Sequence, residues 1–135
     1  MLRLGENCCA DTRARRVALL IDGNAYFDAF MRAAERAQRS ILILGWDFDS
    51  RTVLSYDEAG RPRVQLGDFL NRLARRRRSL QVRILNWDYP MVFGKDRELL
   101  PTLGLNWKPH RRIQYRFDNT LPLGGSQHQK IVMID

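Results

Sequence analysis

The end of the chain carries a histidine, a lysine and an aspartate whose spacing suits phosphate chemistry. His128, Lys130 and Asp135 form the pattern H-x-K-x-x-x-x-D. Residues two apart on an extended strand point to the same face, so the imidazole and the ammonium group would lie side by side. An imidazole can attack phosphorus or protonate a leaving oxygen, while an ammonium group neutralises the non-bridging oxygens. The pair therefore predicts a phosphodiester site.

The strand that would carry this pair is predicted to be buried. Residues Ile131 to Ile134 are apolar on both faces, as in a strand inside a parallel sheet. Lys130 would then lie beside buried surface and need an anion. The chain has only three lysines beside 20 arginines, which argues against Lys130 as ordinary surface decoration. The alternative is a histidine and a lysine at a strand edge, satisfied by local partners.

Asp135 needs a separate explanation, because it lies an odd number of positions from His128. On a straight strand its side chain would face away from the imidazole. It either reaches back through a turn or accepts hydrogen bonds from structural backbone groups, and we favour the backbone groups.

The segment from Gly125 to Asp135 resembles the first catalytic motif of the phospholipase D superfamily. Three earlier segments are similar to stretches that precede this motif in bacterial phospholipase D-like proteins: Asp22 to Phe27, Ile41 to Asp49, and Ile84 to Asp88. The resemblance runs from about Gly5 to Asp135. It implies an α/β/α sandwich with a mainly parallel or mixed sheet.

In that family two His-Lys-Asp motifs meet, one histidine forming a phosphohistidine and the other protonating the leaving alcohol. The resemblance implies either histidine role for His128, phosphate binding for Lys130 and local support for Asp135, with no metal or cofactor. A second motif is missing here. We therefore expect residues 1–135 to be the N-terminal part of a phospholipase D-like catalytic domain, incomplete at its C-terminus. A C-terminal half with a second motif, or a homodimer partner, would complete the site, and the chain alone would be inactive.

For the intact protein the resemblance implies a phosphodiesterase that hydrolyses or transfers phospholipid headgroups. The first alternative is a relative that cuts nucleic-acid backbones. The second, from another class, is a non-catalytic anion-binding or assembly domain. A net charge of +8 favours an anionic partner, whether phospholipid, a membrane surface or nucleic acid, without choosing among them.

Periodicity predicts alternating strands and helices along the chain. Apolar stripes at helical spacing begin at Phe27 and at Leu66. Turn chemistry marks residues 57–62 as a small hairpin or excursion. Strands are predicted at 17–21, 41–46, 80–85, 112–117 and 127–134, and a third helix at 95–103. This order predicts a mainly parallel sheet with helices on both sides.

Sites in open α/β sheets form beyond the carboxyl ends of the strands. Trp46 ends the strand predicted at 41–46 and Asp47 follows it. Both are our candidates for substrate binding, and residues 86–88 follow another strand end. The alternative places Trp46 and Trp87 as core anchors, with the carboxylates capping turns. His110 is predicted to be a loop histidine rather than a second catalytic base.

Size and composition indicate one globular domain, with 135 residues and 44% hydrophobic content. The longest aliphatic runs are too short to span a membrane, and residues 1–16 do not resemble a secretory signal. Adjacent Cys8 and Cys9 are expected to be free thiols. A cytoplasmic protein is therefore expected, with membrane association left open. The run Arg75 to Arg78 is interpreted as a solvated helix end, the alternative being a dedicated nucleic-acid or lipid patch.

Overall fold

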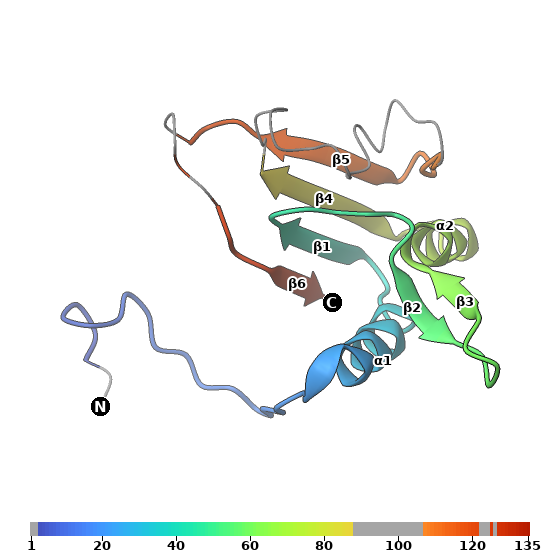
Figure 1. Ribbon diagram of the computed structural model, residues 1–135. Helices are drawn as coiled ribbons and strands as arrows, with labels where there is room; N and C mark the ends of the chain where they lie inside the picture. Colours follow the sequence, from blue (N-terminus) through green and yellow to red (C-terminus); the bar gives the residue numbers. More distant parts are fainter. Residues whose placement is uncertain (1–2, 88–106, 122–124, 126) are drawn as a thin grey trace.

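The computed structural model describes residues 3–87, 107–121, 125 and 127–135 (Figure 1). Two helices and six strands follow one another in these ranges. In chain order they are α1 (Asp22–Ala34), β1 (Ser40–Gly45), β2 (Val53–Tyr56), β3 (Pro62–Gln65), α2 (Leu66–Arg76), β4 (Gln81–Trp87), β5 (Ile113–Asp118) and β6 (Ile131–Ile134). The helix predicted at 95–103 lies outside the described residues.

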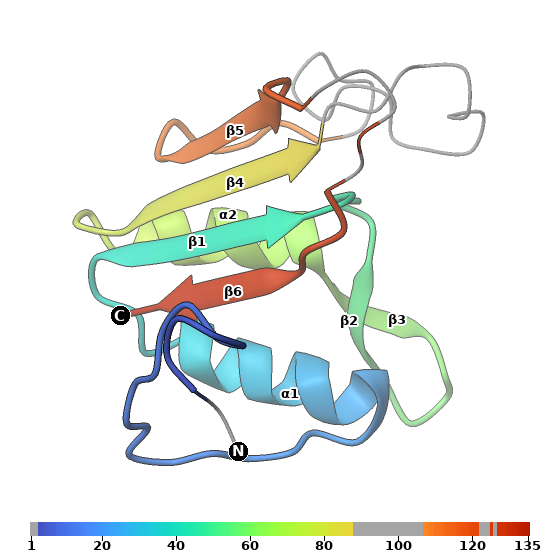
Figure 2. The ribbon, with the colours of Figure 1, turned by 90° about the vertical axis from the view of Figure 1, so that its left-hand side faces the viewer.

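Four strands form one mixed sheet in the order β5-β4-β1-β6. Strand β4 pairs in parallel with both β1 and β5, and β6 pairs antiparallel with β1. The carboxyl ends of β1, β4 and β5 consequently meet at one edge of the sheet, and β6 begins at that same edge (Figure 2). The sequence prediction of a mainly parallel or mixed sheet is confirmed.

Both helices contribute to one hydrophobic core against this sheet. Phe30 of α1 and Phe69 of α2 are buried, and their ring centroids lie 5.9 Å apart. Ile41, Val82 and Ile84 of the central strands complete the core. The apolar stripes predicted from helical spacing are therefore the faces that pack. The structure shows a mixed α/β domain, and the described residues provide no second helical layer for the expected α/β/α sandwich.

A hairpin of β2 and β3 occupies the region where turn chemistry predicted an excursion. Asp57 organises its turn, because its Oδ1 accepts hydrogen bonds from the backbone N–H groups of Ala59 and Arg61. Gly60 adopts φ +74°, a conformation that favours glycine. The hairpin lies between β1 and α2 in the sequence and forms a separate two-stranded sheet.

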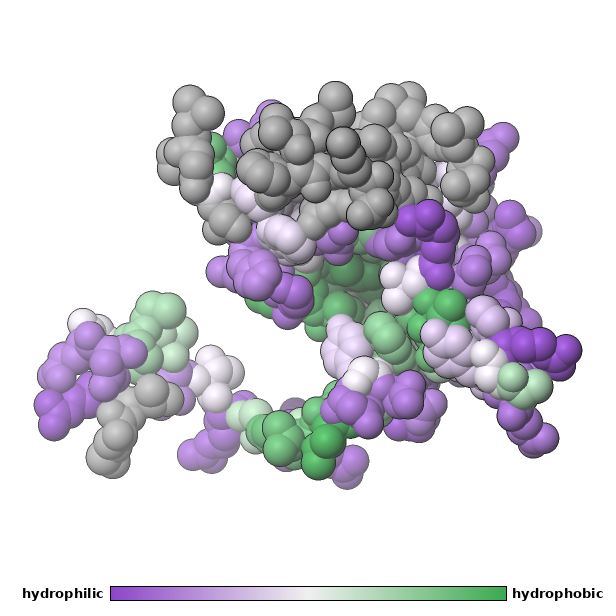
Figure 3. Space-filling model, viewed as in Figure 1, coloured by the Kyte–Doolittle hydropathy of each residue, from purple (hydrophilic) through white to green (hydrophobic). Residues whose placement is uncertain are grey.

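The strand predicted at 17–21 is wrong. These residues form no strand, and Val17 and Leu19 are 88% and 90% exposed. Figure 3 shows this segment as hydrophobic surface leading into α1. An apolar run needs a backbone partner to become a strand, and β1 already pairs with β4 on one side and β6 on the other. The predicted helix start at residues 22–24 is confirmed, with Asp22 Oδ1 accepting the Ala25 N–H.

Candidate functional site

His128 and Lys130 lie in the segment that enters β6, not in the strand itself. The prediction that a strand covers both residues is therefore wrong, and strand alternation does not fix their shared face. Both side chains are exposed, and Lys130 Nζ donates a hydrogen bond to the His128 carbonyl oxygen at 3.4 Å. The local-partner alternative thus describes part of the lysine's environment.

The burial predicted for the run after Lys130 is also wrong. Strand β6 joins the sheet at its edge, and the side chains of Ile131 and Met133 are 43% and 59% exposed. Val132 and Ile134, on the alternate positions, pack against the core. The ammonium group of Lys130 therefore faces open surface, where a ligand can reach it.

An aromatic side chain at one strand end contacts His128, and a second, from the neighbouring strand end, stacks on the first. The Trp46 and His128 rings are 5.5 Å apart at 87°, an edge-on contact. Trp46 in turn stacks on Trp87, with centroids 6.2 Å apart and planes at 25°. The register pairs Gly45 with Asn86, so each tryptophan follows directly after a paired position of neighbouring parallel strands. The structure therefore brings the predicted Trp46 together with His128 at the carboxyl edge.

The sequence prediction did not include Trp87 as a site residue. The feature that could have identified it is its position at a strand end, which matches that of Trp46. Both tryptophans are half-buried rather than fully enclosed. An indole in this situation combines an apolar body with an accessible surface that can contact a ligand. The interpretation of the two tryptophans as core anchors alone is thus incomplete.

The acidic residues after β1 stabilise the turn that follows the strand. Asp47 Oδ1 accepts the Phe48 N–H at 2.9 Å. Asp49 accepts the Arg51 N–H at 2.8 Å and forms an ion pair with the Arg51 guanidinium at 2.7 Å. Both carboxylates therefore cap the turn, which is the alternative that the sequence left open. The structure does not pair Asp47 with His128, so Asp47 remains a substrate-binding candidate by its place on the rim alone.

Asp135 acts on the backbone, as its spacing predicted. Its carboxylate accepts hydrogen bonds from the N–H groups of Gln38, Arg39 and Ser40 at 3.1, 2.9 and 3.0 Å. These bonds, with that of Ser40 foremost, hold the pKa of the Asp135 carboxyl below its usual value. Because β6 runs antiparallel to β1, Asp135 lies at the amino edge of the sheet and His128 at the carboxyl edge. Asp135 is thus a structural residue in this chain rather than a contact of the imidazole.

His110 lies in the loop before β5, as predicted, and its backbone N–H donates to Asn71 Oδ1 at 2.7 Å. Strand β5 begins at the amino edge of the sheet, opposite to the edge near His128. A strand of six residues separates the two edges by about 20 Å. The two histidines of this chain therefore cannot act on the same phosphate group within one molecule.

The described residues contain neither a cluster of metal-ligating side chains nor a helix that could span a membrane. Residues 3–87, 107–121, 125 and 127–135 contain no group of three or more histidine, cysteine, aspartate or glutamate side chains placed to hold a metal ion. Within the same ranges neither helix has the length and apolarity needed to cross a bilayer.

Comparison with known proteins adds no assignment to this geometry. Neither the known protein-family models nor the curated proteins include a match to the chain. The candidate site therefore stands on the residues themselves: an exposed imidazole in contact with an indole, and a neighbouring ammonium group.

Proposed function

We propose that this chain is the N-terminal part of a phospholipase D-like phosphodiesterase and supplies one half of a two-histidine site. The observation that carries the proposal is the position of His128 against Trp46 at the carboxyl edge of the sheet, with Lys130 two residues further on. Ligand sites in open α/β sheets form at this edge. The resemblance of residues 125–135 to the family's motif supports the same assignment. The α/β/α sandwich with a further helical layer belongs to this proposal.

The proposed reaction needs two imidazoles in separate roles. A ring nitrogen of one attacks phosphorus, and the P–O bond to the leaving alcohol breaks as the P–N bond forms. The other imidazole gives its proton to the leaving oxygen and then takes one from water or an acceptor alcohol. Attack by that oxygen breaks the P–N bond and frees the first histidine. Lys130 neutralises the non-bridging oxygens throughout.

His128 fills one of these roles, and the second imidazole must come from outside these residues. His110 is excluded, because it lies at the opposite edge of the sheet. A C-terminal half with its own motif, or a second copy of the chain, would supply it. A monomer of 135 residues is accordingly expected to show little turnover of an unactivated phosphodiester.

Phospholipid headgroups are the proposed substrate, and Trp46 and Trp87 support this choice. Half-buried indoles suit the interface between lipid and water, because part of each ring stays accessible to the lipid. The proposal includes a cytoplasmic protein that contacts a membrane surface. The same indoles could stack on bases, so a nucleic-acid phosphodiesterase is the second candidate.

An activated diester tests the imidazole directly. 4-Nitrophenolate leaves without being protonated, so a methyl 4-nitrophenyl phosphate needs only the nucleophile. If His128 is that nucleophile, mass spectrometry will find a methylphosphoryl group on His128 in the wild-type chain and on the same residue in Gln129→Asn, and none in His128→Asn. Lys130→Gln should slow adduct formation, while Lys108→Gln, which removes a lysine elsewhere, should not.

The remaining alternatives are a lipid substrate, a nucleic-acid substrate and a non-catalytic domain. To separate them, turnover is measured on phosphatidylcholine vesicles and on single-stranded DNA, with the protein in its active assembly. His128→Asn should lower kcat/KM on the vesicles by at least about 100-fold in either histidine role. Turnover of DNA alone would replace lipid with nucleic acid as the substrate. Unchanged activity and binding in His128→Asn would favour the non-catalytic domain. Robust hydrolysis of vesicles by a demonstrably monomeric 135-residue sample would refute the two-imidazole scheme.

A further inference from the structure

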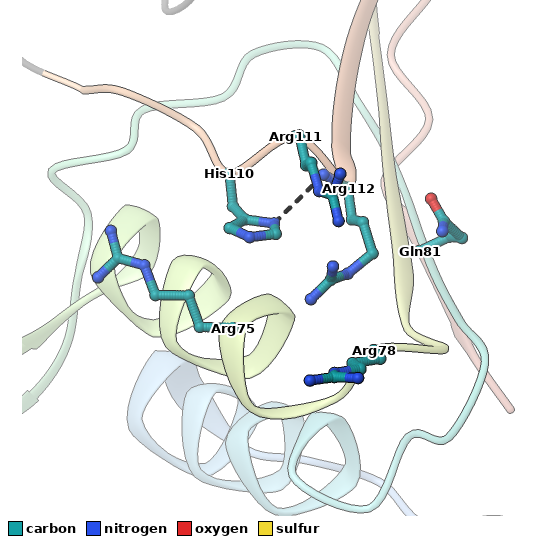
Figure 4. A pocket seen from close by; sticks show the side chains of 6 residues that line it. All are labelled: Arg75, Arg78, Gln81, His110, Arg111 and Arg112. Carbon is teal, nitrogen blue, oxygen red and sulfur yellow. Dashed lines mark hydrogen bonds between the residues drawn. The ribbon is translucent and has the colours of Figure 1, made fainter.

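A second charged site lies at the opposite edge of the sheet from His128. A cavity of about 700 Å³ opens where α2 ends and where β4 and β5 begin (Figure 4). We call it the basic pocket. It is lined by Arg75, Arg78, Gln81, His110, Arg111 and Arg112. Its volume falls within the roughly 300–1,000 Å³ typical of small-ligand sites.

The lining carries four guanidinium groups and no carboxylate. Like charges gathered in one cavity repel one another, and an anion relieves that repulsion. A guanidinium presents its N–H donors as a planar fork that matches phosphate oxygens. The lining therefore favours a ligand with phosphate groups over a neutral one.

The arginine run 75–78, which begins in the last turn of α2, contains residues with two different tasks. Arg77 turns away from the pocket and donates hydrogen bonds to the carbonyl oxygens of Ala37 and Glu35. Arg75 and Arg78 line the pocket and are exposed. The sequence pattern favoured a solvated helix end for the whole run. In the fold, Arg77 instead binds backbone carbonyl oxygens, while Arg75 and Arg78 line the pocket.

Hydrogen bonds to α2 hold Arg112 and His110 in place. Arg112 donates a hydrogen bond to the Ala74 carbonyl at the end of α2, while its buried Nε has no partner within the described residues. The guanidinium is thereby anchored to the end of α2. Asn71, itself buried, accepts the His110 backbone N–H. The pocket is therefore preformed on two sides, which lowers the entropic cost of binding.

The His110 ring is set to donate rather than to accept. Its Nδ1 accepts the Arg112 backbone N–H at 3.3 Å, so in the neutral ring the proton is on Nε2. Burial, followed by the charges of Arg112 and Arg111, lowers the pKa of His110. An anion in the pocket would oppose these charges and raise that pKa.

We propose that the basic pocket binds a phosphate dianion, either the headgroup of a phosphomonoester lipid or a soluble phosphate compound. The four guanidiniums provide the charge, and the His110 Nε2–H provides a neutral donor at the cavity wall. This site is independent of the function proposed for His128, because it lies at the amino edge of the sheet and shares no residue with that site.

Titration with pyrophosphate tests the pocket, using isothermal calorimetry at fixed ionic strength. The double variant Arg75→Gln/Arg111→Gln removes two exposed charges from the lining. We expect it to weaken binding at least tenfold, equivalent to about 1.4 kcal/mol. The matched control Arg16→Gln/Arg63→Gln removes two exposed arginines elsewhere and should change binding less than about twofold. Equal weakening by both double variants would overturn the proposal, because it would show attraction to net charge alone.

The His110 ring signal provides a second readout that net charge does not mimic. In NMR titrations, pyrophosphate at about the wild-type Kd should raise the pKa of His110 in the wild-type chain and raise it much less in Arg75→Gln/Arg111→Gln. An unchanged His110 pKa in the wild-type chain would contradict binding in the pocket.

Vesicles distinguish the two sources of phosphate. Binding to vesicles with phosphatidic acid, but not to pure phosphatidylcholine, would identify a lipid headgroup, provided that the double variant abolishes it. Binding of pyrophosphate without any binding to vesicles would identify a soluble ligand. Binding of neither would overturn the proposal.

Discussion

Asn71 fixes the loop that leads into β5, and its removal should be costly. The side chain is 7% exposed. Its Oδ1 accepts the His110 N–H at 2.7 Å, and its Nδ2 donates to the Lys108 carbonyl at 3.1 Å. Asn71→Ala leaves both backbone groups without this partner. An unsatisfied buried group costs about 1–3 kcal/mol, and because these bonds are only partly buried we take about 1 kcal/mol for each.

The matched control is Asn24→Ala, an exposed asparagine in the first turn of α1. Both substitutions place alanine in a helix and gain a similar helix propensity, so this gain largely cancels in the comparison. The expected difference in the free energy of unfolding is about 2 kcal/mol, the sum of the two lost bonds. At about 4 °C per kcal/mol for a chain of this size, Asn71→Ala should unfold about 8 °C below Asn24→Ala.

Thermal unfolding followed by circular dichroism measures this difference, and urea unfolding gives the free energies. Hydrogen exchange at the His110 amide gives a local readout, because that proton loses its acceptor in Asn71→Ala. Unfolding midpoints that agree within about 2 °C, together with an equally protected His110 amide, would show that Asn71 does not fix this loop.

Two further substitutions test packing and charge elsewhere in the chain. A Cβ at Gly67 would lie 2.6 Å from Trp107 Nε1, so Gly67→Ala should lower the free energy of unfolding by about 1–3 kcal/mol in urea. Gly23→Ala, at the same position of α1, should cause no such loss, because its Cβ would meet only Phe27 at 4.0 Å. Equal stabilities would contradict the overlap. Because the backbone N–H of Ser40 and its neighbours lower the pKa of Asp135, its carboxylate stabilises the fold above an unfolded-state pKa of about 3.9 and loses this effect as the pH falls through the folded value. The difference in Tm between wild type and Asp135→Asn should therefore close as the pH falls from about 5 towards 2, and a difference independent of pH would refute the assigned charge effect.

Elements set by local patterns could be predicted from the sequence. The stripes beginning at Phe27 and Leu66 became the packed faces of α1 and α2, because helical periodicity is a property of neighbouring residues. The odd spacing of Asp135 to His128 predicts only that its carboxylate faces away from the imidazole. Its backbone partners lie 95 or more positions earlier in the chain and depend on the pairing of β6 with β1.

Features that depend on long-range pairing could not be predicted in this way. The run 131–134 is equally apolar in a buried parallel strand and in an edge strand, and only its antiparallel pairing with β1 decides the matter. The contact between Trp46 and Trp87 follows from the register of β1 and β4, which links residues about 40 positions apart. The run 17–21 had the composition of a strand and lacked a partner.

The two edges of the sheet differ in the phosphate charge that they suit. At the carboxyl edge Lys130 is the cation beside His128, which matches the single negative charge of a phosphodiester. At the amino edge the basic pocket gathers four guanidiniums, a field better balanced by a dianion. The parallel pairing of β1, β4 and β5 produces this separation, because it places the starts of these three strands at one edge and their ends at the other. On this reasoning a neutralising substitution in the pocket should alter the proposed dianion binding and leave the proposed phosphodiester chemistry at His128 unchanged.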